Sequence, residues 1–240
     1  MRAGTYSWTP LTAADDLLWL KYWWGPGSAN ALAFRQKDGD WAIISPPSDA
    51  PQTVFDQIAL RGPVTALIAP NGFHYLGQAA WRRRFPEARS FAPAGTLPRL
   101  AAKAPDVDFQ PMEDHLDRFA PAQIVIPSGM KTPDAMMSWP IDGGWLWWLG
   151  DQYVNNGKAD QILPLRLLSR LLAGGPGYHC NPRPELVYVE DRRAWAADIA
   201  QGFSDRPPKT VLCAHGDPVF GDAEKRTIAS LHDVAGAAAL

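Results

Sequence analysis

Three short stretches of this sequence each place a side chain that can bind a metal ion just beyond an apolar run. These side chains are His74, Asp151 and His215. Loops that follow strands hold functional side chains on a rigid scaffold, so the three could converge on one site. Two histidines and a carboxylate that leave a fourth position open form a known catalytic zinc arrangement, in which the pKa of bound water falls to about 7. The pattern therefore suggests metal-assisted hydrolysis.

Each of the three residues also has an ordinary structural interpretation. His74 can begin a helix, Asp151 can cap a turn, and His215 can be a hydrogen-bonded histidine beside a glycine turn. The functional hypothesis therefore depends on all three occurring together. His115 and His179 could also enter a site, but a surface or structural role is favoured for an isolated histidine.

Apolar runs and turn signals predict the elements that would position these side chains. An Asp-Gly pair at residues 38–39 separates apolar segments 30–34 and 41–44, which is typical of a β-hairpin. Residues 64–69 form a continuous apolar run, as in strands buried on both faces. Further strands are predicted at residues 88–92, 124–126, 145–149, 186–189 and 210–214. Helices are predicted at residues 51–62, 75–85, 94–104, 163–172, 192–203 and 222–234.

The order of these elements predicts an α/β protein. Strand-then-helix order occurs in both halves, roughly residues 30–120 and 123–240, and each half should contribute a β-sheet with helices outside. Such a chain forms either a four-layer αββα arrangement or a doubly wound sheet. No repeat or linker interrupts the sequence, so we expect a single domain over residues 1–240.

Composition excludes several classes of partner. The net charge of −2 and the 20% content of charged residues leave no basic stripe for nucleic acid. The run 145–149 is far shorter than the roughly 18 residues of a membrane span, and Asp15 and Asp16 interrupt any apolar leader. Two cysteines are too few for a disulfide framework. We therefore expect a cytoplasmic protein without a membrane or nucleic-acid partner.

The order of the motifs resembles that of the metallo-β-lactamase superfamily over nearly the whole chain. The hairpin, the strand-loop-helix around residue 70, the strand ending in Gly-Asp and the late strand ending in Ala-His-Gly follow the family order. The sequence looks closer still to an uncharacterised bacterial branch, in which Ser45-Pro46 follows the hairpin and an Asn-x-x-His loop replaces the full metal motif. The resemblance implies a single α/β domain of the four-layer αββα sandwich type.

The same resemblance implies a degenerate metal motif. The family carries His-x-His-x-Asp-His after its first long buried strand, and the four ligand positions here hold Ala69, Asn71, Phe73 and His74. Only the last residue matches. The third-motif histidine of the family corresponds best to Met130, which cannot replace it as a zinc ligand.

One of the family's two metal ions would therefore retain a fuller ligand set than the other. The first ion would keep only Asp151, so the resemblance implies that this site cannot hold zinc tightly. The second would keep His74, Asp151 and His215, with Phe73 in place of its acidic ligand. The expected cofactor is accordingly none, or one zinc ion.

Two functional classes remain, and a metal-poor protein that binds a small ligand or another protein at the ancestral site is favoured. Trp23, Trp24 and Phe73 would offer apolar contacts there, since an aromatic pair next to the turn 25–27 can lie on a pocket rim. On this hypothesis Phe73→Asp restores a carboxylate and raises zinc affinity at least tenfold, or about 1.4 kcal/mol.

The alternative is a single-zinc hydrolase. Its metal ligands would be His74, Asp151 and His215, and Asn71 or Tyr75 would orient an oxyanion. A serine hydrolase is a weaker competitor, because the sequence contains no Gly-x-Ser-x-Gly elbow.

Overall fold

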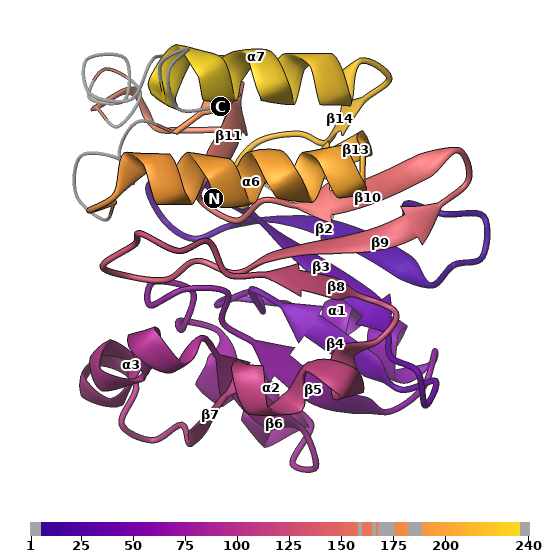
Figure 1. Ribbon diagram of the computed structural model, residues 1–240. Coiled ribbons are helices and arrows are strands. Elements are labelled where there is room, and N and C mark those ends of the chain that lie inside the picture. Colours follow the sequence, from indigo (N-terminus) through magenta and orange to yellow (C-terminus); the bar gives the residue numbers. More distant parts are fainter. Residues whose placement is uncertain (1–5, 158–159, 165–166, 168–175, 182–188, 236–240) are drawn as a thin grey trace. The chain divides into compact units, whose positions relative to one another are not determined.

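The computed structural model describes residues 6–157, 160–164, 167, 176–181 and 189–235 (Figure 1). The chain divides into two units, Met1–Pro121 and Ala122–Leu240. This division falls where the sequence separates its two strand-helix halves, and each unit contains a β-sheet as predicted.

The first unit is built on a seven-stranded sheet whose strands follow one another in chain order. They are β1 (Thr9–Pro10), β2 (Leu17–Trp23), β3 (Ser28–Arg35), β4 (Trp41–Ile44), β5 (Val64–Ile68), β6 (Arg89–Ala92) and β7 (Phe109–Pro111). Strands β1 to β4 pair antiparallel, and β4 to β7 pair parallel. The predicted hairpin is confirmed as β3 and β4, with Gly39 at φ +88° in its turn.

Parallel strands need crossover connections, and helices supply them in the first unit. These are α1 (Gln52–Ala59), α2 (Gln78–Arg84), the 3₁₀ turn η1 (Ala94–Thr96) and α3 (Leu97–Lys103), and a further 3₁₀ segment, η2 (Met112–Phe119), follows β7. Helix α2 begins three residues later than the predicted 75, because the chain after β5 first forms a run of turns. That run of turns holds several of the predicted site residues.

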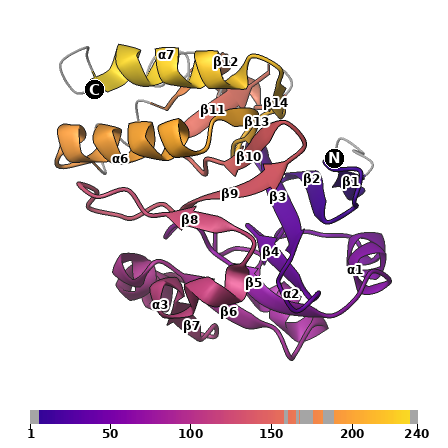
Figure 2. The same ribbon diagram turned by 45° about the vertical axis from the view of Figure 1, so that its right-hand side comes forward.

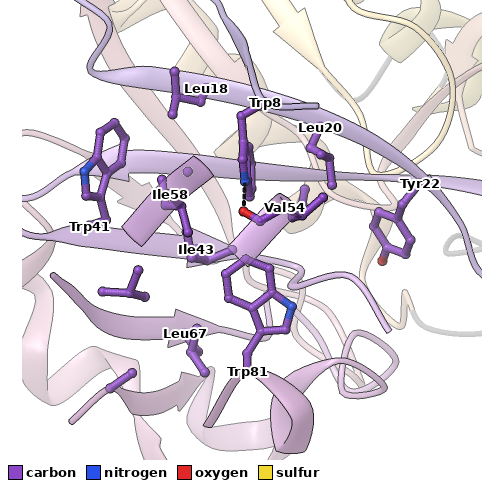
Figure 3. Close-up of a cluster of buried hydrophobic side chains, with 14 of the residues drawn as sticks. Trp8, Leu18, Leu20, Tyr22, Trp41, Ile43, Val54, Ile58, Leu67 and Trp81 are labelled. Atoms are coloured by element: carbon purple, nitrogen blue, oxygen red, sulfur yellow. Dashed lines mark hydrogen bonds between the residues drawn. The ribbon is translucent and has the colours of Figure 1, made fainter. Parts of the chain in front are cut away.

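The core of the first unit explains much of its tryptophan content (Figure 3). Trp8, Trp41 and Trp81 are buried with Leu18, Leu20, Tyr22, Ile43, Val54, Ile58 and Leu67. The Trp8 indole N–H donates to the carbonyl of Val54 on α1 at 3.2 Å, and that of Trp81 donates to the carbonyl of Pro47 at 3.1 Å. The indoles of Trp8 and Trp81 are therefore hydrogen-bonded as well as packed, which helps to fix α1 and α2 on this face of the sheet.

The second unit holds a five-stranded sheet and a two-stranded sheet. The larger sheet has the order β14-β13-β10-β9-β8, and the smaller pairs β11 with β12. Their bounds are β8 (Gln123–Val125), β9 (Met136–Ile141), β10 (Gly144–Trp148), β11 (Tyr153–Asn156), β12 (Gly177–Cys180), β13 (Pro208–Leu212) and β14 (Val219–Phe220). Strands β10 and β13 pair parallel, so the loops that follow them leave the same edge of the sheet.

Two helices of the second unit lie side by side, α6 (Arg192–Asp205) and α7 (Ala223–Ala235) (Figure 2). Helix α6 is capped at its N-terminus by Asp191, whose side chain accepts hydrogen bonds from the amides of Arg193 and Ala194. Both helices pack on a core that includes Trp147 and Val211 of the sheet. Both were predicted from the sequence.

Parts of two predicted elements lie outside the described residues. They are residues 165–166 and 168–172 of the predicted helix 163–172, and residues 186–188 of the predicted strand 186–189. Among the helices that the structure does describe, none is both long enough and apolar enough to cross a membrane.

Candidate functional site

The loop after β5, residues 69–77, holds five of the positions singled out in the sequence. Ala69 is fully buried in a small cluster with Ala92 and Leu100, and Tyr75 packs against the same cluster. Asn71 is 3% exposed, and its side-chain oxygen accepts a hydrogen bond from the Phe73 amide at 2.8 Å. The loop is therefore shaped by core packing and by a local asparagine turn.

His74 is held by a serine at the end of the neighbouring strand. Its Nδ1 lies 2.5 Å from Ser45 Oγ, and the Tyr22 hydroxyl lies 3.4 Å from the same oxygen. Ser45 is 1% exposed and has φ +53°, a conformation that few residues other than glycine adopt. The sequence marked Ser45 only as part of a dipeptide, and nothing local links it to a histidine 29 positions away.

Phe73 lies beneath an arginine from α3. The guanidinium carbon of Arg99 is 4.1 Å from the centre of the Phe73 ring, and Arg99 Nε donates to the Gly72 carbonyl at 3.0 Å. A Cβ atom on Gly72 would lie 2.7 Å from Arg99 Cδ, so only glycine lets the arginine cross the loop without a shift. A positive charge therefore lies on the loop at Phe73.

In the second unit, the structure brings two predicted site residues together. The Nε2 atom of His215 lies 3.4 Å from Oδ1 of Asp151, and each side chain is about one-quarter exposed, at 27% and 24%. The two loops are joined by a hydrogen bond from the Ala214 amide to the Gly150 carbonyl at 2.8 Å. Their proximity follows from the parallel pairing of β10 and β13.

The spacing between these two atoms is informative. A direct N–H···O hydrogen bond is usually about 2.9–3.0 Å long, so 3.4 Å makes a weak one. Two atoms bound to one tetrahedral zinc ion, each at about 2.0–2.1 Å, lie roughly 3.3 Å apart. The imidazole and the carboxylate therefore have the separation of two ligands of one metal ion.

Solved structures with similar folds cover nearly the whole chain. They include a metallo-β-lactamase from Erythrobacter litoralis, with 16% identity, a TM-score of 0.59 and coverage of 97% of this chain and 99% of that one. Another is the metallo-β-lactamase FIM-1 from Pseudomonas aeruginosa in its mono-zinc form, with 16% identity, a TM-score of 0.60 and 96% coverage of both chains. A third is a putative diflavin flavoprotein fragment from Nostoc sp. PCC 7120, with 12% identity, a TM-score of 0.60 and 97% coverage of both chains.

The chain has the metallo-β-lactamase fold. This confirms the α/β fold class expected from the order of the motifs. No protein-family model matches the chain, and no curated protein matches it in sequence. At identities of 12–16%, the likeness establishes the fold and nothing about substrate.

A buried carboxylate missed by the sequence analysis supports the Asp151 loop of this metallo-β-lactamase fold. Asp134 is 3% exposed, and its Oδ2 accepts from the Asp151 amide at 2.9 Å and from Gln152 Nε2 at 3.3 Å. The Gln152 oxygen in turn accepts from the Trp195 indole at 2.9 Å, and Asn181 Nδ2 donates to the Asp151 carbonyl at 3.0 Å. No local pattern distinguishes Asp134 from the other acidic residues of the sequence.

Met130, at the position that the resemblance assigns to a third-motif histidine, is half-buried in the second unit. It forms an isolated bridge with Val189, and its sulfur accepts from Gln152 Nε2 at 3.4 Å. The side chain also lies against the core that contains Trp195. The Met130 side chain therefore has a packing role.

The predicted ligands belong to different units. His74 lies in the first, and Asp151 and His215 lie in the second. Within the described part of either unit, no three histidine, cysteine, aspartate or glutamate side chains gather as a metal ion would require. That His74 joins the other two, and that Asn71 or Tyr75 orients an oxyanion, stay predictions.

Two residues before His215 in the chain, a cysteine remains protonated at neutral pH. Burial raises the pKa of the Cys213 thiol well above its usual value, and the Asp151 carboxylate raises it further. A neutral buried thiol is neither a good metal ligand nor a nucleophile. Cys213 therefore belongs to the core.

Proposed function

We propose that this chain is a metallo-β-lactamase-fold protein that binds a small molecule at the ancestral site and holds no metal ion tightly there. The observation that supports this best is the Arg99 guanidinium, 4.1 Å from the centre of the Phe73 ring. The resemblance assigns an acidic metal ligand to position 73, and a fixed cation there opposes a second cation.

The residues at the other positions of the ancestral two-metal site also fit metal ions poorly. Ala69 is a buried methyl group, Met130 is packed against Gln152, and the Asn71 side-chain oxygen already accepts the Phe73 amide. None of these side chains offers the imidazole nitrogen that a zinc site of this kind needs. The proposal therefore gives the loop after β5 a role in ligand binding.

Metal analysis tests the proposal directly. Protein purified without chelator and without a nickel column should contain well below one zinc ion per chain, and calorimetric titration with zinc should show weak binding. If the titration shows zinc binding, Asp151→Asn tests whether that binding depends on the Asp151 carboxylate, because the variant keeps the shape of the side chain and removes its charge. One tightly held zinc ion per wild-type chain would contradict the proposal.

A second function, single-zinc hydrolysis, is favoured by one observation, the 3.4 Å separation of Asp151 Oδ1 and His215 Nε2. In this alternative these two side chains hold zinc, and His74 is added as third ligand on the resemblance alone. The chemistry that zinc supplies at such sites is a water molecule of lowered pKa. Asn71 or Tyr75 would orient the oxyanion.

An activity assay with added zinc distinguishes the two proposed functions. The hydrolase requires zinc-dependent turnover of a chromogenic β-lactam or a p-nitrophenyl ester, abolished in both Asp151→Asn and His215→Ala. Weak zinc binding without turnover of either substrate would leave the ligand-binding function in place.

A further inference from the structure

Arg99, on α3 of the first unit, is an exposed side chain held in one geometry. Its Nε donates to the Gly72 carbonyl at 3.0 Å, and one face of its guanidinium covers Phe73. The missing side chain at Gly72 leaves the space that the arginine occupies. An arginine fixed in this way loses little rotamer entropy when it binds a further group.

The hydrogen bond to Gly72 and the ring contact with Phe73 leave one edge of the Arg99 guanidinium available for a ligand. With Nε used by Gly72, the edge formed by Nη1 and Nη2 remains, and no carboxylate or carbonyl of the described residues bonds to it. Two parallel N–H groups on one edge match the two oxygens of a carboxylate.

A second arginine of the same unit, Arg84, lies over an aromatic ring and is also paired with a carboxylate of the chain. Arg84 also lies over a phenyl ring, with its guanidinium carbon 5.4 Å from the centre of Phe85. Its Nη2, however, lies 3.3 Å from Asp56 Oδ1, so a carboxylate of the chain already occupies this guanidinium. Arg99 has the same aromatic support, but no carboxylate of the described residues pairs with it.

We propose that Arg99 binds the carboxylate of a small organic acid whose apolar part lies against Phe73. This inference rests on the proposed ligand-binding function and names the chemical class of its ligand. Phe73 is 36% exposed and Leu76, three residues along the loop, is 54% exposed, so apolar surface is available beside the charge. A single guanidinium with apolar neighbours suits a singly charged carboxylate better than a phosphate, which several donors usually surround.

A titration with sodium benzoate tests the proposal. The signals followed by NMR are the Nε–H of Arg99 and the amides of Gly72 and Phe73, at an ionic strength held constant with chloride. The wild type should show saturable shifts at all three, and neutral benzamide should not. Arg99→Gln should weaken benzoate binding at least fivefold, whereas Arg84→Gln, the matched control, should change it less than twofold.

Several outcomes would overturn the proposal. They are equal losses in the two variants, equal binding of benzamide, no shift at the three signals, or tighter binding of inorganic phosphate than of benzoate. Should Arg99→Gln fail to fold, Arg99→Lys decides instead, because it keeps the charge and removes the edge with two N–H donors. Undiminished benzoate binding by Arg99→Lys would contradict the proposed contact between two N–H groups and the carboxylate. Benzoate binding by a protein that also holds zinc tightly would reject the proposed metal-poor function and retain the Arg99 site.

Discussion

The loop after β5 and the loops after β10 and β13 both lie at carboxyl ends of parallel strands, where α/β proteins commonly bind ligands. They differ in chemistry. The first holds Phe73 beneath a cation, and the second holds Asp151 and His215 at the spacing of metal ligands. Equivalent places in the two sheets thus carry different side-chain chemistry.

The physical basis of this difference lies in what supports each loop. The loop after β5 is held by side-chain hydrogen bonds, one within the Asn71 turn and one from Arg99 of α3 to Gly72. The loops of the second unit are held by backbone bonds and by buried Asp134. Substitutions should therefore reshape the first loop locally and disturb the second unit more widely.

The largest effect is expected at Gly216, which follows His215. Its φ is +95°, and a Cβ atom there would lie 1.8 Å from the Asn155 carbonyl oxygen. Gly216→Ala should therefore lower the free energy of unfolding by about 3 kcal/mol or more, measured by urea denaturation. Gly177→Ala is the control, since φ is +107° with no atom within 4 Å, and it should cost only about 1–2 kcal/mol. Equal losses in the two variants would show that the close approach to Asn155 is unimportant.

Asp134→Ala should have the next largest effect. It leaves the Asp151 amide and Gln152 without their buried acceptor, so the free energy of unfolding should fall by about 2–3 kcal/mol. Asp134→Asn keeps one carbonyl oxygen and should lose less than the alanine variant. An Asp134→Ala protein as stable as the wild type would show that the hydrogen bonds of Asp134 do not stabilise the second unit.

Alkaline pH should weaken the second unit selectively. Burial raises the pKa of Cys213, Tyr153 and Tyr178 well above their usual values, so the folded protein keeps protons that the unfolded chain loses. The stability that these groups contribute is complete below the unfolded pKa values, 9.0 for cysteine and 10.0 for tyrosine, and is lost as pH rises above them. Between pH 9 and 10 the free energy of unfolding should fall by about 1–2 kcal/mol.

Urea denaturation at several pH values measures this slope. Cys213→Ala removes the component that begins near pH 9 and should make the slope shallower. An unchanged slope in that variant would assign the loss to other groups.

The smallest effect, about 1.4 kcal/mol, concerns zinc affinity at position 73. Because Arg99 lies over this position, a carboxylate introduced by Phe73→Asp would pair with the guanidinium and gain little for zinc. The tenfold rise expected from the sequence should therefore require the double variant Phe73→Asp/Arg99→Gln. Calorimetric titration of both proteins decides this, and a full tenfold rise in the single variant would show that Arg99 does not oppose metal binding.

The sequence predicted the elements that hold the site residues better than the contacts around them. Continuous apolar runs identified β5, β10 and β13, because strands buried on both faces need such runs. Strand β2 was missed, although its buried residues Leu18, Leu20 and Tyr22 alternate along the chain as in a strand. The other strands that were missed are β1, β7, β9, β11, β12 and β14.

Site contacts were harder to predict because they join distant residues. Arg99 and Gly72 are 27 positions apart, and Asp134 and Asp151 are 17 apart. Their types are common on protein surfaces, and only tertiary structure brings them together. Local patterns predicted an α/β protein and the resemblance predicted its fold, but neither could predict the positive charge on the loop after β5.

The parallel pairing of β10 with β13 has a consequence for motion. The Leu149 amide donates to the Leu212 carbonyl, and the Ala214 amide donates to the Gly150 carbonyl, so the two strand ends are joined by successive rungs. An opening that frees one loop must break bonds of the other, and hydrogen exchange at these two amides should therefore occur in one cooperative event. The carboxylate of Asp151 and the imidazole of His215 are then presented or withdrawn together.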